Sequence, residues 1–233
     1  MPRIVRHPEL RRGEILDCAQ ALFLTRGYDH ASLNDVIAAA GLSKGAFYHY
    51  FASKEALLEA LAERLARQAL VRIQDVLDEP GLDALARLNA VLTRSRQAKL
   101  ETLAVTWPLF ETLFRPENLV LFHRINGAAS ALFLPILAGI VAKGVEDGTF
   151  DTFDPEGVAE MMLQLGAATH GIIARAMAEA GDMAAAVPAL ERRVQLYALA
   201  LDRILGLPDG SIRLTEPGHV EAVMTARRMN AGR

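Results

Sequence analysis

The sequence predicts an all-α protein, and three kinds of observation support that class. After Ser53, apolar residues recur at helical rather than alternating spacing in every long segment. Prolines and glycines divide these segments, as at Pro80-Gly81. Serine or aspartate stands where helix N-caps are expected, at Ser32, Ser43 and Asp154. With 233 residues, 52% of them hydrophobic, the chain can bury a substantial core.

The first expected elements are two helices that lead into a sharp turn. Residues 14–23 predict a helix whose inner face carries Cys18, and this single cysteine cannot form an internal disulfide. Ser32 is expected to cap the next helix together with Asp35, three residues later, as in a capping box. Gly41 then ends that helix, because glycine tolerates the left-handed backbone of a tight reversal.

The helix after Ser43 has two faces of different character. Phe47 and Phe51 lie four residues apart and are expected to face inward. The expected outward residues are Lys44, Gly45, Tyr48 and His49. This set suits a DNA groove, since glycine lets the backbone approach a phosphate while lysine and tyrosine donate hydrogen bonds. Exposed aromatics also occur on hairpins without a function, but the cap, the turn and the inward phenylalanines together favour a helix-turn-helix.

Proline and glycine set the bounds of the later helices. These are expected at about residues 53–80, 82–105, 116–144, 154–180 and 188–206, with a break at Trp107-Pro108 and a short helix to Phe114. The most apolar run, residues 127–142, is shorter than the roughly 20 residues that cross a bilayer and is interpreted as a buried core helix. The opening residues lack the apolar region of a secretory signal. We therefore expect a cytoplasmic protein with no membrane partner.

The charge distribution limits the mode of any DNA contact. A net charge of −3 argues against a uniformly basic coat. Lys and Arg number seven against six Asp and Glu up to Glu55, and eighteen against twenty-two after it. Contact is therefore expected from individually placed residues. The basic start of the chain, with Arg3, Arg6, Arg11 and Arg12, is expected to reach a minor groove or a phosphate.

Residues from about 11 to 58 resemble the DNA-binding region of the TetR family of transcriptional regulators. The resemblance lies in the 14–23 helix, Gly27-Tyr28, and the segments GLSKG, YHYF and SKEAL. It implies an N-terminal three-helix domain with the helix-turn-helix, at 1–54, and a C-terminal helical ligand-binding and dimerisation domain, at 55–210. For the tail at 211–233, a short helix and a free end both stay open. Ala46 stands where the family commonly has a small hydroxyl residue, so the usual base contact is not assumed there.

The expected DNA contacts are of two kinds. Phosphate anchors are expected at Ser32, Ser43 and Lys54, helped by the partial positive charge of helix N-termini. The residues expected to enter or line the major groove are Lys44, Gly45, Tyr48, His49 and Tyr50.

The middle and the end of the chain are expected to hold an effector and a partner copy. An apolar chamber with a few polar groups suits a small molecule. Taken singly, Trp107, the phenylalanines and His170 are more often core residues than pocket residues. The candidate residues of the chamber are Trp107, Phe110, Glu111, Phe114, Phe122, His123, Asn126 and His170. The last two helices carry broad apolar stripes, and the resemblance implies that they pair in a four-helix bundle, although a core-only role stays open. The candidate dimer residues are Met162, Leu165, Thr169, Ile173, Val194, Tyr197 and Leu201.

Together these features predict a homodimeric repressor that binds a palindromic DNA operator and releases it when a small-molecule effector binds. The half-sites would lie about 34–36 Å apart. A ligand-independent or activating regulator stays open, since repression follows from the resemblance alone. An all-α enzyme that uses Glu111, His123 and His170 is disfavoured, because the sequence shows no nucleophile–base spacing, phosphate loop or metal-ligand set. No catalytic residue, metal or cofactor is expected.

Overall fold

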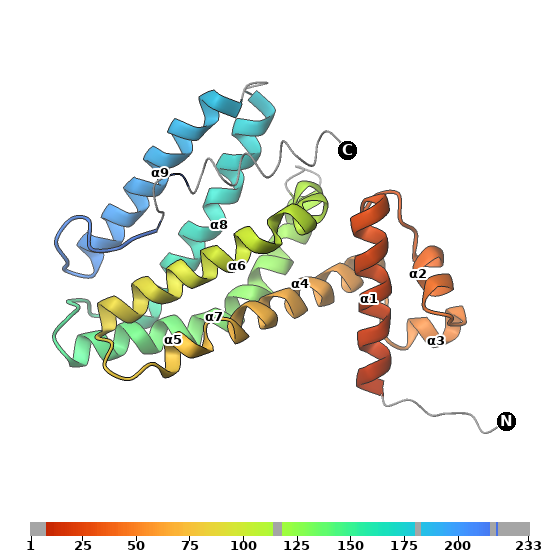
Figure 1. Ribbon diagram of the computed structural model, residues 1–233, viewed down its shortest axis with the longest axis horizontal. Helices are drawn as coiled ribbons and strands as arrows, with labels where there is room; N and C mark the ends of the chain where they lie inside the picture. The colour runs from red at the N-terminus through yellow and green to blue at the C-terminus, as the bar shows by residue number, and fades with distance from the viewer. Residues whose placement is uncertain (1–7, 114–117, 180–182, 215–217, 219–233) are drawn as a thin grey trace. The chain divides into compact units, whose positions relative to one another are not determined.

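The computed structural model describes residues 8–113, 118–179, 183–214 and 218; for 99–113, 169–179, 183–187, 189 and 190 it describes the backbone only. Within these residues every regular element is a helix, as Figure 1 shows. The prediction of an all-α fold is therefore confirmed. The chain divides into two compact units, one of residues 1–65 and 105–125 and the other of residues 66–104 and 126–233.

The first unit, called here the reading unit, is built on three N-terminal helices and the start of a fourth. These are α1 (Pro8–Arg26), α2 (Leu33–Ala39), α3 (Lys44–Tyr48) and α4 (Lys54–Val71). In Figure 1, α2 and α3 lie together beside α1. The buried side chains of all four helices meet in one core, which includes Ile15, Phe23, Val36, Phe47 and Leu57. Leu121 and Ile125 at the start of α7 (Leu119–Glu146) belong to the same core.

The second unit has its own core, formed by the later helices. These are α5 (Gln74–Asp78), α6 (Ala84–Leu113) up to residue 104, most of α7, α8 (Pro155–Glu179) and α9 (Met183–Ile204). Leu88, Val141, Ala159 and Leu201 are among the side chains buried there. In Figure 1, α8 and α9 run side by side. The segment after α9, residues 207–214, is called here the strap; its Ile212 is 3% exposed and lies in the same core.

Three predicted helix bounds were wrong. Helix α6 continues through Pro108 to Leu113, because a proline removes one bond from a long helical ladder without necessarily ending it. The helix predicted over 53–80 ends at Val71 and is followed by the separate α5, with Ile73 between them fully buried. The sequence has no proline or glycine at residues 72–73 to predict that break, and Ile73 lies in the core of the second unit. Helix α9 begins at Met183, five residues before Pro188.

The apolar helix α7 is longer than the apolar run that predicted it. By length and composition it passes the test for a membrane span, with a mean hydropathy of 1.9 in its most apolar window, 22% of which is buried. A core helix of a soluble protein passes the same test. Leu137, Ile140 and Val141 are buried in the second unit, so one face of α7 belongs to the core. The sequence predicted a core helix, but only part of the apolar window is buried.

The predicted domain limits differ from the compact units in two places. The start of α4 packs with the reading unit beyond residue 54, and the strap packs with the second unit beyond residue 210. The division of function between these domains stays a prediction.

Candidate DNA-reading surface

Helix α2 begins with a complete capping box, as predicted. The Ser32 hydroxyl accepts a bond from the Asp35 N–H at 3.2 Å, and the Asp35 carboxylate accepts one from the Ser32 N–H at 2.8 Å. The Ser32 hydroxyl also donates to this carboxylate at 2.6 Å. These bonds favour the ionised form, so they lower the pKa of Asp35. The start of α2 is thus defined by contacts within four successive residues.

The turn between α2 and α3 depends on one glycine. Gly41 has φ +62°, in the left-handed region that side chains with a Cβ rarely adopt. The Leu42 N–H donates to the Ile37 carbonyl at 3.0 Å, which closes the end of α2. Ser43 then caps α3, its hydroxyl accepting from the Ala46 N–H at 3.3 Å. The predicted turn and cap are both confirmed.

The short helix α3 presents two faces, as its spacing predicts. Phe47 is fully buried and Phe51 is 3% exposed, and their ring centroids lie 6.0 Å apart. The exposed residues of the other face are Lys44, Gly45, Tyr48 and His49. Tyr48 is 52% exposed while the edge of its ring meets Phe47. Tyr50, a further expected groove residue, is instead half-buried against the core.

Lys54, expected to anchor a phosphate, is held at the first turn of α4. Its ammonium lies 4.1 Å from the centroid of the Tyr28 ring, within the range of a cation–π contact. Burial lowers the pKa of Lys54 and raises that of the Tyr28 phenol above its ordinary value. Ser53 caps this helix through the Ala56 N–H at 3.1 Å. The lysine cation is therefore placed at a helix N-terminus, next to α3 in sequence.

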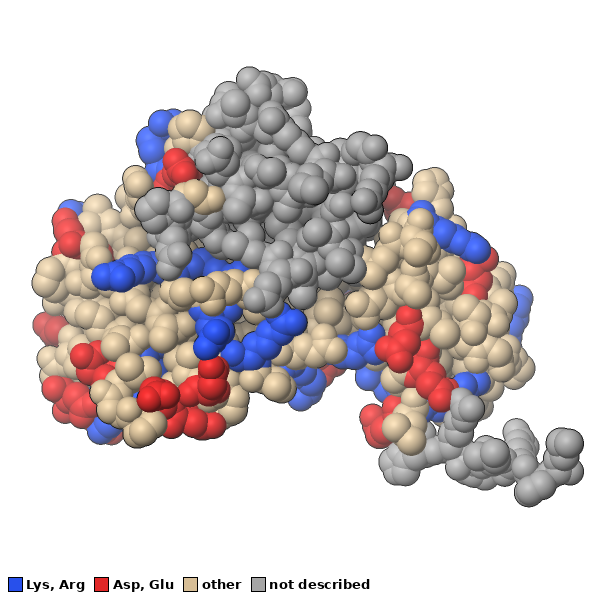
Figure 2. Space-filling view, in the orientation of Figure 1, with Lys and Arg blue, Asp and Glu red and all other residues tan. Residues whose placement is uncertain are grey.

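Charge on the reading unit is mixed. On the face seen in Figure 2, this part of the molecule carries both basic and acidic side chains. This pattern agrees with contact by placed residues. Of the expected basic arm, Arg3 and Arg6 lie outside the described residues, whereas Arg11 and Arg12 belong to α1 and contact the chain itself.

Few of the expected effector residues have described side chains. Those outside the described side chains are Trp107, Phe110, Glu111, Phe114 and His170. Phe122 is half-buried against the reading-unit core, and His123 is exposed with its ring 5.8 Å from that of Phe122. Asn126 is half-buried in the second unit. The chamber therefore stays a prediction.

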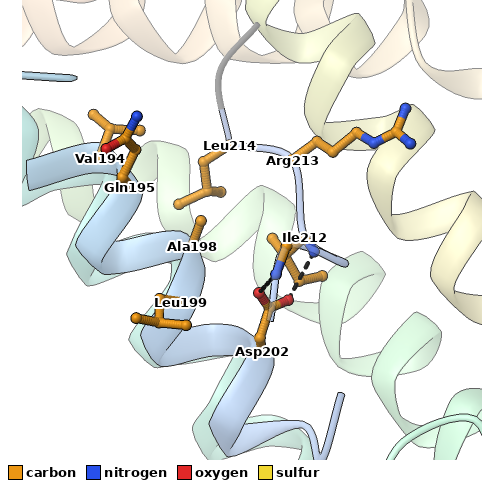
Figure 3. Close-up of a pocket in the computed structure, with 9 residues that line it drawn as sticks. Val194, Gln195, Ala198, Leu199, Asp202, Ile212, Arg213 and Leu214 are labelled. Atoms are coloured by element: carbon orange, nitrogen blue, oxygen red, sulfur yellow. Dashed lines mark hydrogen bonds between the residues drawn. The ribbon is translucent and has the colours of Figure 1, made fainter. Parts of the chain in front are cut away.

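A groove that the sequence did not predict lies between α9 and the strap, as Figure 3 shows. Its volume is about 310 Å³, and its apolar lining includes Val194, Ala198, Leu199 and Leu214. Asp202, which borders it, is fully buried and accepts bonds from the N–H groups of Gly210 and Ile212, both at 2.7 Å. A search for local motifs misses this arrangement, because the strap residues carry no recognisable pattern.

The expected dimer residues already have neighbours within the chain. Met162, Val194 and Leu201 are at most 7% exposed, and Leu165 and Tyr197 are half-buried. The side chains of Thr169 and Ile173 lie outside the described ones. The exposed large apolar residues described on α8 and α9 are Met161, at 45%, and Leu196, at 53%. Sequence reasoning placed Met161 in the apolar stripe of its helix but not among the candidate dimer residues, and it did not name Leu196.

Comparison with known proteins identifies the reading unit. Residues 15–61 match the family described as bacterial regulatory proteins, tetR family. The chain is 29% identical over 143 residues to the transcriptional repressor KstR2 of Rhodococcus jostii, covering 60% of this chain and 68% of the relative. These matches support a TetR-family transcriptional regulator. It is 33% identical over 98 residues to KstR2 of Mycobacterium tuberculosis, covering 42% of this chain and 48% of that protein, about half its length.

Two solved structures share the fold over most of this chain. A TetR-family regulator from Pectobacterium atrosepticum superposes with a TM-score of 0.64 at 24% identity, covering 88% of this chain and 100% of that one. RolR in complex with resorcinol gives 0.59 at 20% identity, with 94% of each chain covered. At these identities the likeness concerns the fold alone. The KstR2 relatives are named as transcriptional repressors, which supports a DNA-binding transcriptional regulator and gives the enzyme alternative no support.

Proposed function

We propose that the protein is a homodimeric repressor that binds a palindromic DNA operator and releases it on binding a small molecule. The observation that carries this proposal is the structure of α3. A capped helix with Phe47 and Phe51 buried holds its polar and aromatic face outward at a fixed register. The names of the KstR2 relatives support repression, since both are called repressors.

In this proposal the outward face of α3 enters the major groove. Lys44 binds a phosphate or a base edge, and Tyr48 and His49 contact bases or the backbone. Gly45 lets the backbone approach the DNA closely. Ser32, Ser43 and Lys54 lie at the starts of α2, α3 and α4, where free N–H groups and the helix dipole favour phosphates. Tyr50 supports α3 from the core side.

The partner copy is proposed to pack on α8 and α9. Most apolar residues of these helices whose side chains are described are packed inside the chain, so among them the surface for a partner centres on the exposed Met161 and Leu196. An isologous pair would place two reading helices for two half-sites, about one helical turn of DNA apart. The protein would act in the cytoplasm, where its DNA target lies.

The effector is proposed to be a small molecule. RolR, which shares the fold, has been solved with resorcinol, so this fold accommodates a small aromatic ligand in that protein. A ligand here must bind one arrangement of the dimer better than the other, since only differential affinity shifts such an equilibrium. Trp107, Phe110 and His170 are among the residues proposed to line its chamber.

The experiment begins with selection of genomic fragments by the purified full chain. The affinity for an enriched fragment is then measured at several salt concentrations for Lys44→Gln and for a matched control, Lys143→Gln. Lys143 is an exposed lysine at the end of α7, paired with Glu146 and Asp147, far in sequence from α3. Lys44→Gln should weaken binding and reduce the salt slope by about one phosphate contact. The control should change neither.

Two results would contradict the proposal. Equal binding by wild type and Lys44→Gln at every salt concentration would remove α3 from the interface. A monomer bound to a site without two-fold symmetry, measured by light scattering of the complex, would exclude the dimeric form.

A further inference from the structure

Two neighbouring arginines of α1 contact the chain on either side of α3. Their sequence position predicts an arm that contacts DNA, but both guanidinium groups are directed to other parts of the reading unit. We propose that Arg11 and Arg12 are positioning residues. They fix the segment that contains the turn and α3, one before the turn and the other after α3, and they do not themselves bind DNA. This role depends on the DNA-reading function proposed for α3.

Arg11 holds the chain just before the turn. Its Nη2 donates to the Ala40 carbonyl at 2.8 Å, across 29 residues of sequence, and its Nη1 pairs with Glu14. Ala40 is the C-cap of α2 and directly precedes Gly41, the residue with positive φ. Carbonyls at a helix C-terminus lack helical partners, and a cation is favoured there by the helix dipole. Arg11 therefore donates a hydrogen bond to a carbonyl that has no partner within α2.

Arg12 holds the chain just after the recognition helix. Its guanidinium carbon lies 5.2 Å from the centroid of the Phe51 ring, in the range of a cation–π contact. Phe51 is 3% exposed and also packs against Phe47 of α3. The ring is therefore fixed between α1 and the inner face of α3.

The segment between these two contacts needs such support. Helix α3 has five residues, far fewer than an isolated helix requires to be stable in water. Its direction is therefore set by what holds its ends. Successive residues of a helix point about 100° apart, so Arg11 and Arg12 can reach Ala40 and Phe51 from adjacent positions of α1. The buried Phe47 fixes the middle of α3, and the two arginines fix its flanks.

The same geometry argues against direct phosphate binding by Arg11. Its side chain is 19% exposed, and its two terminal nitrogens already bind Glu14 and Ala40. A phosphate contact would break one of these bonds. Lys44 of α3, by contrast, is exposed.

The test compares Arg11→Gln, Arg11→Lys and Arg12→Gln with Lys143→Gln as the neutral control. Each variant is first checked by circular dichroism. Amide hydrogen exchange of the free protein is then measured for residues 40–51. Affinity is measured from low to moderate salt for two duplexes of equal length: one enriched by the wild type from a random library, and one of arbitrary sequence.

Positioning predicts a specific pattern. Arg11→Gln and Arg12→Gln should speed exchange in residues 40–51 and weaken the enriched duplex by about tenfold or more, since a lost bond to a charged group has that effect. Affinity for the arbitrary duplex and both salt slopes should stay as in the wild type. Arg11→Lys keeps one donor for Ala40 and should restore part of the loss, which also separates positioning from misfolding.

Opposite results overturn the role. An equal loss on both duplexes with a salt slope reduced by about one contact would make these arginines phosphate ligands. Unchanged exchange in residues 40–51 would show that they do not hold the turn, whatever the binding data. Failure of the wild type to enrich any duplex would count against the proposed function instead, and the exchange measurement would still decide the role of the two arginines.

Discussion

The reading unit and the strap are both fixed by hydrogen bonds to backbone groups, but over different sequence distances. Ser32 and Asp35 bond across three residues, and so do Ser43 and Ala46. In the strap, Asn89 of α6 donates to the Ser211 carbonyl and accepts from the Arg213 N–H, across 122 and 124 residues. Arg96 donates to the Arg213 carbonyl across 117 residues.

The chemistry in the two regions is the same. A buried backbone N–H or carbonyl needs a partner, and either a neighbouring side chain or a distant helix can supply one. In the reading unit the partner that caps the start of α2 or α3 lies in the same turn, so these two helix starts form nearly independently, whereas the end of α2 also takes a bond from Arg11 of α1. In the strap the partners come from α6 and α9, so the strap can be ordered only after the second unit has folded. The two regions should therefore respond differently to substitution.

The largest effect is expected from cavities in the two cores. Phe47→Ala should cost about 3–5 kcal/mol and Leu205→Ala about 2–5 kcal/mol, because both side chains are fully buried. Urea unfolding followed by circular dichroism measures the loss, and hydrogen exchange locates it. Phe47→Ala should raise exchange in α1 to α3, whereas Leu205→Ala should raise it in the strap and α9. A loss spread equally over both units by either variant would contradict two separate cores.

A smaller effect is expected from the buried carboxylate under the strap. Asp202→Asn replaces one acceptor oxygen with a donor facing a backbone N–H, which should cost about 1–3 kcal/mol. Faster exchange should be confined to the amides of Gly210 and Ile212 and their neighbours in the strap. Asp209→Asn is the matched control, since that exposed carboxylate pairs only with Arg203, at 3.6 Å, among the contacts described for it. If exchange in the strap did not change in Asp202→Asn, Asp202 would not be its anchor.

These two regions also show what sequence reasoning could reach. The caps at Ser32 and Ser43, the turn at Gly41 and the inward Phe47 were all predicted, because each depends on residues within one or two helical turns. The roles of Asn89 and Asp202 were not, because a single asparagine or aspartate in a helix has no local signature. The break at Ile73 was missed because its side chain is buried by residues distant in sequence, and the continuation past Pro108 was missed because a proline does not necessarily end a long helix.

A third effect, smaller again, tests the local character of the reading unit. Ser32→Ala removes the cap acceptor of α2 and should cost about 1 kcal/mol. The change should be confined to the start of α2 in hydrogen exchange, with the strap unaffected. Ser211→Ala is the control, because it removes an exposed hydroxyl that donates to Pro208 and should change stability by less than about 0.5 kcal/mol. If the two substitutions lowered the free energy of unfolding equally, the capping box would not stabilise the protein more than an exposed serine does.

The smallest effect is a pH dependence that belongs to the same capping box. The Ser32 hydroxyl and N–H lower the pKa of Asp35 below its ordinary value of 3.8. The folded state therefore binds this proton less readily than the unfolded chain does. The resulting stabilisation is present above the ordinary pKa and is lost as the pH falls through the pKa of the folded state.

Asp35→Asn keeps an acceptor for the Ser32 N–H but cannot titrate, so the difference in free energy of unfolding between wild type and variant should narrow on acidification. Urea unfolding at a series of pH values from neutral to acidic measures this difference. A gap that stayed constant across the series would mean that the Asp35 charge contributes nothing to the cap, leaving only the neutral hydrogen bonds to define the start of α2.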